Sequence, residues 1–80
     1  MCRIKAKVEE GLMPSERVVR IPTAEGGSEE FTVSARQVQG ETVVASCIGI
    51  ENGRVLVEMP RESAAGKWRN WVDADTVIRS

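Results

Sequence analysis

Histidine and tyrosine are absent from this 80-residue sequence, and its aromatic residues are two tryptophans and one phenylalanine. Histidine is the commonest general base and metal ligand in proteins, so its absence excludes Ser-His and Cys-His nucleophile pairs. Asp73 and Asp75 could supply two oxygen ligands to a cation, but no further ligand follows nearby, and turn chemistry explains them more simply. We therefore predict no catalytic residue, no metal site and no cofactor, which favours a protein that is not an enzyme.

Cysteine is also scarce. Cys2 and Cys47 are too few for a disulfide framework or a zinc site. We predict free thiols, with Cys47 buried or half-buried in a strand and Cys2 exposed near the terminus. A single bridge between the two is the alternative, and reducing conditions would disfavour it.

Long apolar runs are missing as well. No segment approaches the roughly 20 apolar residues of a membrane span, and no apolar stretch follows the charged first residues as it would in a signal peptide. We therefore expect no membrane contact and a cytoplasmic location. The 11 Lys and Arg nearly balance the 12 Asp and Glu, which argues against a dedicated nucleic-acid binder. The apolar fraction of 41% fits a globular protein, here a single domain over residues 1–80.

What the sequence does contain is a strong hairpin signal, Asn52-Gly53 between two alternating runs. A two-residue turn there places Glu51 opposite Arg54, an opposite-charge pair. Continuing this register predicts one core face and leaves Leu56 on the other face. The predicted core face consists of Ile48, Ile50, Val55, Val57 and Met59.

The remaining sequence predicts further short strands separated by turns. Besides the second hairpin strand, 54–59, the predicted strands cover residues 3–9, 16–21, 30–36, 42–50 and 68–72, with a short closing strand at 77–78. Gly49 suggests a bulge or bend in the long fourth strand. Residues 37–41 fit either a hairpin turn around Gln39-Gly40 or a short helical turn that starts at Ser34. Five to six short antiparallel strands in a chain of this size indicate a small barrel, because closure removes exposed edges.

The C-terminal stretch 66–78 resembles the end of Src-homology-3-like (SH3-like) domains. These domains close with a strand that carries Trp-Val, a one-turn helix and a short apolar strand. Trp71-Val72, residues 73–75 and Val77-Ile78 match those parts. The resemblance implies an all-β, single small SH3-like barrel. The tyrosines that line the proline-rich-peptide groove of the eukaryotic members have no counterpart here, so the resemblance does not carry that specificity over.

The two tryptophans are the most informative candidates for binding. Trp68 and Trp71 differ by an odd number and so face opposite sides of a strand. We predict that Trp68 joins the core with Val72, and that Trp71 lies on the outer face beside Arg69, where it forms a patch with Leu56 and Val43. Exposed Trp and Arg are enriched in binding hot spots. The alternative is that Trp71 covers the barrel mouth or packs under the loop at 60–67.

These observations favour a non-catalytic protein-interaction module or small subunit, which binds another protein or itself through Trp71, Arg69 and Leu56. The first alternative is a nucleic-acid-binding barrel that uses the basic stripe Arg3, Lys5 and Lys7. That stripe is more simply a solvated strand face, because no aromatic residue interleaves with it. The second alternative is an oligomeric enzyme with a site at a subunit interface. The identity of the partner and the oligomeric state do not follow from the sequence.

Overall fold

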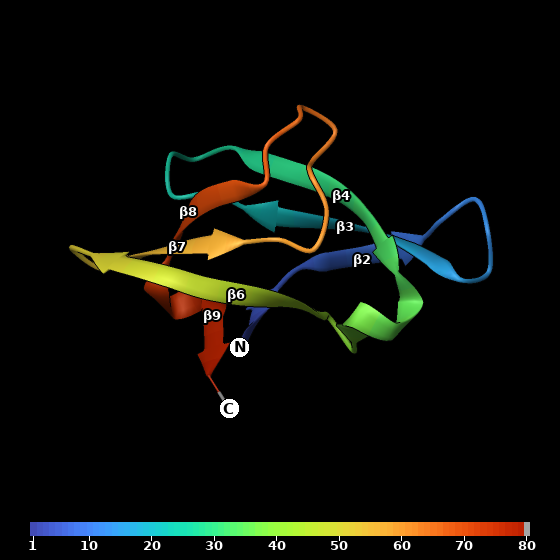
Figure 1. Cartoon of the computed structure of the whole chain (residues 1–80), viewed down its shortest axis with the longest axis horizontal. Helices are drawn as coiled ribbons and strands as arrows, with labels where there is room; N and C mark the ends of the chain where they lie inside the picture. The colour runs from blue at the N-terminus through green and yellow to red at the C-terminus, as the bar shows by residue number, and fades with distance from the viewer. Residues whose placement is uncertain (80) are drawn as a thin grey trace.

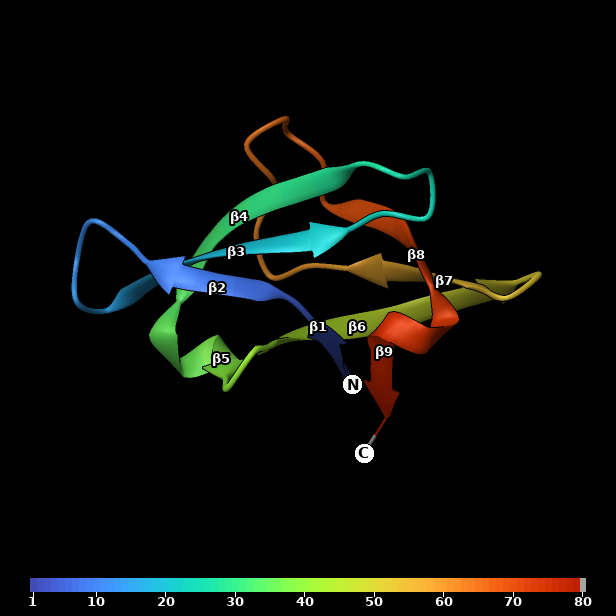
Figure 2. The same cartoon turned by 180° about the vertical axis from the view of Figure 1, so that it is seen from behind.

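The structure, a computed structural model, describes residues 1–79 and is an all-β fold of two antiparallel sheets (Figures 1 and 2). The strands are β1 (Cys2–Lys5), β2 (Lys7–Glu10), β3 (Glu16–Pro22), β4 (Ser28–Ser34), β5 (Val38–Gln39), β6 (Thr42–Glu51), β7 (Arg54–Glu58), β8 (Arg69–Asp73) and β9 (Val77–Arg79). One sheet has the order β8-β7-β6-β1-β9, with β5 beside β6, and the other has the order β2-β3-β4. Both chain ends lie on the same side, where β1 pairs with β9.

The first predicted strand, 3–9, is divided at Ala6. The alternation is confirmed, because Ile4 and Ala6 are buried and Val8 packs against the core. At Ala6, however, the chain passes from the larger sheet to the smaller one, and the Ala6 N–H donates to the Glu41 carbonyl at 2.8 Å. One continuous run of alternating residues therefore serves both sheets.

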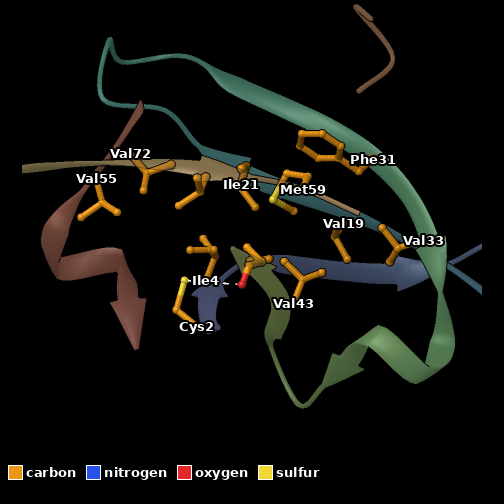
Figure 3. Close-up of a cluster of buried hydrophobic side chains, with 13 residues drawn as sticks. Cys2, Ile4, Val19, Ile21, Phe31, Val33, Val43, Val55, Met59 and Val72 are labelled. Carbon is orange, nitrogen blue, oxygen red and sulfur yellow. Dashed lines mark hydrogen bonds between the residues drawn. The ribbon is translucent and has the colours of Figure 1, made fainter. Parts of the chain in front are cut away.

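The core fills the space between the two sheets (Figure 3). Figure 3 shows Phe31 under β4, with Ile4 and Val43 on the opposite side of the cluster. The fully buried side chains are Phe31, Ile4, Ile21, Met59, Val19, Val33, Val43, Val55, Val57 and Val72. This set confirms the predicted core positions Val55, Val57 and Met59.

The predicted core positions Ile48 and Ile50 are wrong, since these side chains are 44% and 69% exposed. A bulge between Cys47 and Gly49 shifts the register, so that Cys47 rather than Ile48 lies opposite Val57. The bulge at Gly49 was predicted, but its effect on the facing of Ile48 was not. Ile50 lies opposite Val55 as predicted, near the hairpin tip, where it stays exposed.

The turns follow the predicted chemistry. Asn52 and Gly53 have φ values of 50° and 77°, the left-handed pair that a type I′ hairpin needs, and Glu51 pairs with Arg54. Both interpretations of the 37–41 region hold. A 3₁₀ turn over Ala35–Gln37 is capped by Ser34, whose hydroxyl accepts from the Arg36 N–H. A tight hairpin then joins β5 to β6.

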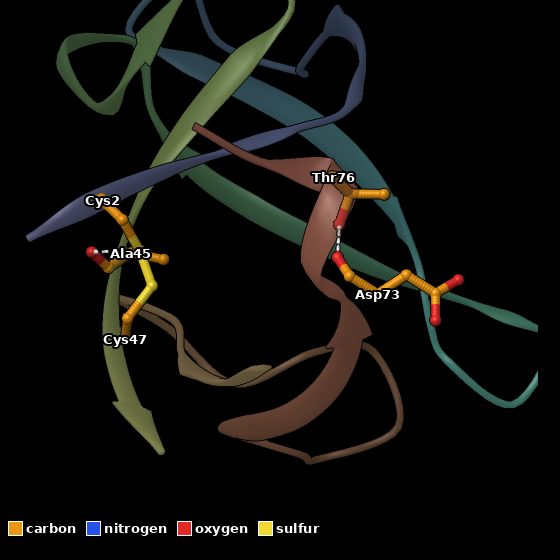
Figure 4. Close-up of a disulfide and its surroundings, with 5 residues drawn as sticks. All are labelled: Cys2, Ala45, Cys47, Asp73 and Thr76. Atoms are coloured by element: carbon orange, nitrogen blue, oxygen red, sulfur yellow. Dashed lines mark hydrogen bonds between the residues drawn. A yellow bond between two sulfur atoms is a disulfide. The ribbon is translucent and has the colours of Figure 1, made fainter. Parts of the chain in front are cut away.

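The predicted turn after residue 72 is a 3₁₀ turn over Ala74–Thr76. Its N-cap, Asp73, makes no side-chain cap hydrogen bond. The Thr76 hydroxyl instead donates to the Asp73 carbonyl at 2.7 Å (Figure 4). The Asp73 carboxylate is thus left on the protein surface.

A closed barrel is not found. In the described range 1–79, the larger sheet ends at β8 on one side and β9 on the other, and these two strands do not pair. Single backbone hydrogen bonds connect the two sheets instead. The Ala24 N–H donates to the Trp71 carbonyl at 2.9 Å, and the Ala64 N–H donates to the Glu30 carbonyl at 2.8 Å.

Cys2 and Cys47 form a disulfide, which corrects the prediction of free thiols (Figure 4). Their Cα atoms are 6.2 Å apart, within the usual range for this bond. Cys2 is also buried rather than exposed, at 4%, because β1 lies between β6 and β9 and so places residue 2 inside the sheet. The cytoplasmic location stays a prediction. No helix within residues 1–79 is long and apolar enough to cross a membrane.

Candidate protein-interaction face

The outer face of β6, β7 and β8 carries the candidate site. Along these strands alternate residues point into the core, among them Val55, Val57 and Val72, and the residues between them point outward. Leu56 lies opposite Gly49 on one side and opposite Trp71 on the other. Both Leu56 and Trp71 are half-buried. These three residues form an apolar line across the sheet, which we call the Leu56 row.

Two polar lines flank the Leu56 row, each about 7 Å away along the strands. On one side the Glu58 row joins Ser46, Glu58 and Arg69, and on the other the Arg54 row joins Glu51, Arg54 and Asp73. All three rows together are called the Trp71 face. Arg69 Nε donates to Glu58 Oε2 at 3.0 Å. This pair is largely exposed, so it contributes at most about 1 kcal/mol to stability.

At the β6 end of the Leu56 row no side chain projects from the sheet, because the residue there is Gly49. A Cβ atom added there would meet Leu56 Cβ at 3.5 Å, an ordinary contact, so a small side chain would fit. Glycine instead leaves that flank of Leu56 uncovered. The neighbouring bulge residue Ile48 is 44% exposed and adds further apolar surface.

The structure brings together Trp71, Arg69 and Leu56, as the sequence predicts for protein binding. Val43, the other residue of the predicted patch, is instead fully buried in the core. Trp71 and Leu56 are direct cross-strand neighbours, and Arg69 is two residues from Trp71 on the same face. The Trp71 backbone is fixed on both sides of the strand, by the β7 ladder and by the hydrogen bond from Ala24. The ring therefore extends from a firmly held position.

Trp68 differs from its prediction, since it is 51% exposed and not in the core. The strand begins one residue later, at Arg69. Trp68 lies instead at a hollow of about 500 Å³ lined by loop residues 60–64 and by Glu30 and Thr32 of β4. Asn70 takes the inward position, opposite Val57, and its buried Nδ2 has no hydrogen-bond partner among residues 1–79.

The basic stripe is not continuous. Arg3 donates to Thr42 Oγ1 at 3.4 Å and lines a hollow with Met1, Cys2 and Val44. The strand break at Ala6 separates it from Lys7, which lines a different open groove of about 640 Å³ with Lys5, Arg20 and Glu41. Arg20 lines the same groove because it lies opposite Lys7 in the β2–β3 pair. The Arg20 side chain forms an ion pair with Glu30 at 2.9 Å.

Sequence reasoning missed Ser63. This residue is 5% exposed, and its hydroxyl oxygen accepts from the Ala65 and Lys67 N–H groups at 3.2 and 3.1 Å. A serine inside a polar loop carries no signal that marks it as buried. No group of three or more potential metal ligands occurs among the described residues.

No known protein family, curated protein or solved structure shows a significant match to this chain.

Proposed function

We propose that this protein is a small, non-catalytic protein-interaction module that binds its partner through the Trp71 face. The observation that supports this best is the Leu56 row, an apolar line within an otherwise charged sheet face. Protein interfaces commonly have an apolar centre and a polar rim, and Trp and Arg are enriched among the residues that dominate binding energy. Trp71 would be the anchor, Leu56 its apolar neighbour, and Arg69 part of the rim.

We also propose that the fold is of the SH3-like class. The strand order β8-β7-β6-β1-β9 supports this proposal, as does the short 3₁₀ turn between β8 and β9. In this interpretation the hairpins of β2, β3 and β4 are an extended insertion between β1 and β6. The fold class by itself does not specify a function.

The nucleic-acid alternative has less support. Lys5 and Lys7 share their groove with Glu41, and the nearby Arg20 is neutralised by Glu30. Neither tryptophan lines that groove, so it offers no stacking platform for bases. The exposed charge available to phosphate is therefore small.

The experiment is a comparison of two tryptophan variants in affinity capture from native extract. The tagged chain, its Trp71→Ala variant and its Trp68→Ala variant are used as baits, with and without nuclease. Trp68 is the matched control, because it is an exposed tryptophan that lies just before β8, beside the hollow lined by loop residues 60–64 and outside the Trp71 face. Capture of an untagged copy of the chain counts as binding in the same way as capture of a different protein.

We expect the wild-type bait to capture one protein in stoichiometric amount, which mass spectrometry identifies. The Trp68→Ala bait should capture the same protein, and the Trp71→Ala bait should not. Binding is then repeated with both proteins purified. Material that disappears with nuclease would favour the basic groove and contradict the proposal. A component that Trp68→Ala loses and Trp71→Ala retains would also contradict it, because the hollow beside Trp68 would then be the binding site.

A further inference from the structure

We infer that the partner of the Trp71 face is a second copy of this chain, bound face to face about a two-fold axis that runs along the Leu56 row. This inference rests on the proposed function and names the occupant of the same surface. It is carried by the distribution of charge on either side of the Leu56 row.

The sign of the charge inverts across the Leu56 row on the two strands that are charged on both sides. On β7, Glu58 lies on one side of Leu56 and Arg54 on the other. On β8, Arg69 lies on one side of Trp71 and Asp73 on the other. Each residue is two positions from its central residue, so each opposite-charge pair is symmetric about the row.

The β6 strand follows the same arrangement with one neutral member. Ser46 belongs to the Glu58 row and Glu51 to the Arg54 row. A serine hydroxyl can donate a hydrogen bond to a carboxylate. When the Glu58 row of one copy faces the Arg54 row of a second copy, each of the three strands therefore places a cation or a hydrogen-bond donor opposite an anion.

A two-fold axis within the interface and along the Leu56 row produces this superposition. Glu58 then faces the second copy's Arg54, and Arg69 faces the second copy's Asp73. Symmetry repeats both contacts, as in any isologous interface. Leu56 and Trp71 lie on the axis and meet their own counterparts, which suits the offset stacking of aromatic rings.

The low glycine end of the row allows the sheets to approach. Gly49 lies on the axis and meets its own counterpart, so no side chain holds the two sheets apart there. Face-to-face sheets pack about 10 Å apart with their strands within about 30° of parallel. Long side chains such as Arg54 and Glu58 tolerate this rotation because they lie close to the axis.

The charges also exclude the competing two-fold arrangement. An axis along β7, parallel to the strands, would place Arg54 against its own counterpart and Glu58 against its own counterpart. It would also place Glu51 against Asp73. Like charges in contact oppose association, so the charge pattern selects the axis that crosses the strands.

The experiment is a charge-exchange series measured by sedimentation velocity over a dilution series of the full chain. Arg54→Glu and Glu58→Arg each place like charges across the interface at two symmetric positions, and the double variant restores opposite charges. Arg20→Glu is the matched control, because it breaks an exposed cross-strand ion pair on the other sheet. Circular dichroism verifies that each variant is folded.

We expect a dimer whose Kd rises at least about tenfold in each single variant, as two symmetric exposed pairs are lost. The double variant should return to within about threefold of the wild-type value, and Arg20→Glu should leave Kd unchanged. Trp71→Ala should dissociate the dimer.

A wild-type chain that is still monomeric at about 1 mM would overturn the inference. If affinity capture then still finds a different protein held by Trp71, the proposed function survives and only the identity of the partner changes. A dimer that is indifferent to the charge series would overturn the axis, and a dimer that also persists in Trp71→Ala would overturn the face.

Discussion

Removal of the Cys2–Cys47 disulfide is one of the perturbations with the largest effects that the structure predicts. The two residues are 45 positions apart, so the bond closes more than half of the chain into a loop. Loop closure of this length is expected to stabilise the folded state by about 4 kcal/mol, through loss of freedom in the unfolded chain. A domain of 80 residues has a total stability of about 4–12 kcal/mol.

In the folded state the disulfide joins β1 to β6. Cys2 lies in β1, which pairs with β6 on one side and with β9 on the other. Cys47 lies beside the bulge of β6. Without the bond, the ladder hydrogen bonds and the burial of Ile4 still hold β1 in place in the folded state, so the loss is mainly in the free energy of unfolding.

The assay is urea unfolding followed by tryptophan fluorescence and circular dichroism. It compares the oxidised protein, the protein in excess dithiol reductant and a Cys2→Ala/Cys47→Ala double variant. We expect the last two to agree with each other and to be about 4 kcal/mol less stable than the first. The melting temperature should fall by about 4–8 °C for each kcal/mol.

Two results would refute this reasoning. The first is a double variant within about 1 kcal/mol of the oxidised wild type, since that is the range of an ordinary substitution. The second is an effect of the reductant on the double variant, which has no bond to reduce. The mass of the intact protein before and after reduction verifies independently that the bond is present.

Three further substitutions test the packing and the turns, each by urea unfolding. Phe31→Ala should cost about 3–5 kcal/mol, because Phe31 is the largest fully buried side chain; a cost below about 1 kcal/mol would contradict its central place. Gly53→Ala should cost about 1 kcal/mol, because the φ of 77° is unfavourable for alanine, and a stabilised variant would argue against the type I′ turn. Ser63→Ala should cost about 1–3 kcal/mol by leaving the Ala65 and Lys67 N–H groups without their acceptor; an unchanged stability would contradict these hydrogen bonds.

The all-β class could be predicted from local signals. The alternation of residues 3–9, the Asn52-Gly53 turn and the glycines of the other turns each limit the backbone to a few conformations. The strand register beyond the hairpin was harder to predict from the sequence. A bulge shifts the facing of one strand by a single residue, and Gly49 predicted the bulge without showing that Ile48 would be the extra residue.

Trp71, Arg69 and Leu56 of the candidate site were predictable from the sequence, but their arrangement and the burial of Val43 were not. The odd spacing of Trp68 and Trp71 placed them on opposite sides, and hot-spot chemistry favoured Trp71 with Arg69. The pairing of Trp71 with Leu56 depends on the β7–β8 register. The loop at 60–67 joins these two strands, and its sequence does not specify a turn of fixed length. Trp68 was wrongly placed in the core because β8 begins only at Arg69.

The sequence by itself determined the strands and turns of this protein, because alternation, glycine and asparagine act over a few neighbouring residues. Only the tertiary structure decided that residue 2 is buried beside Cys47, that the basic residues are divided between two sheets, and that the outward residues of β6, β7 and β8 form an apolar row between two polar rows. These features depend on which strands become neighbours. That choice is made by the burial of one shared core, to which residues far apart in the chain contribute together.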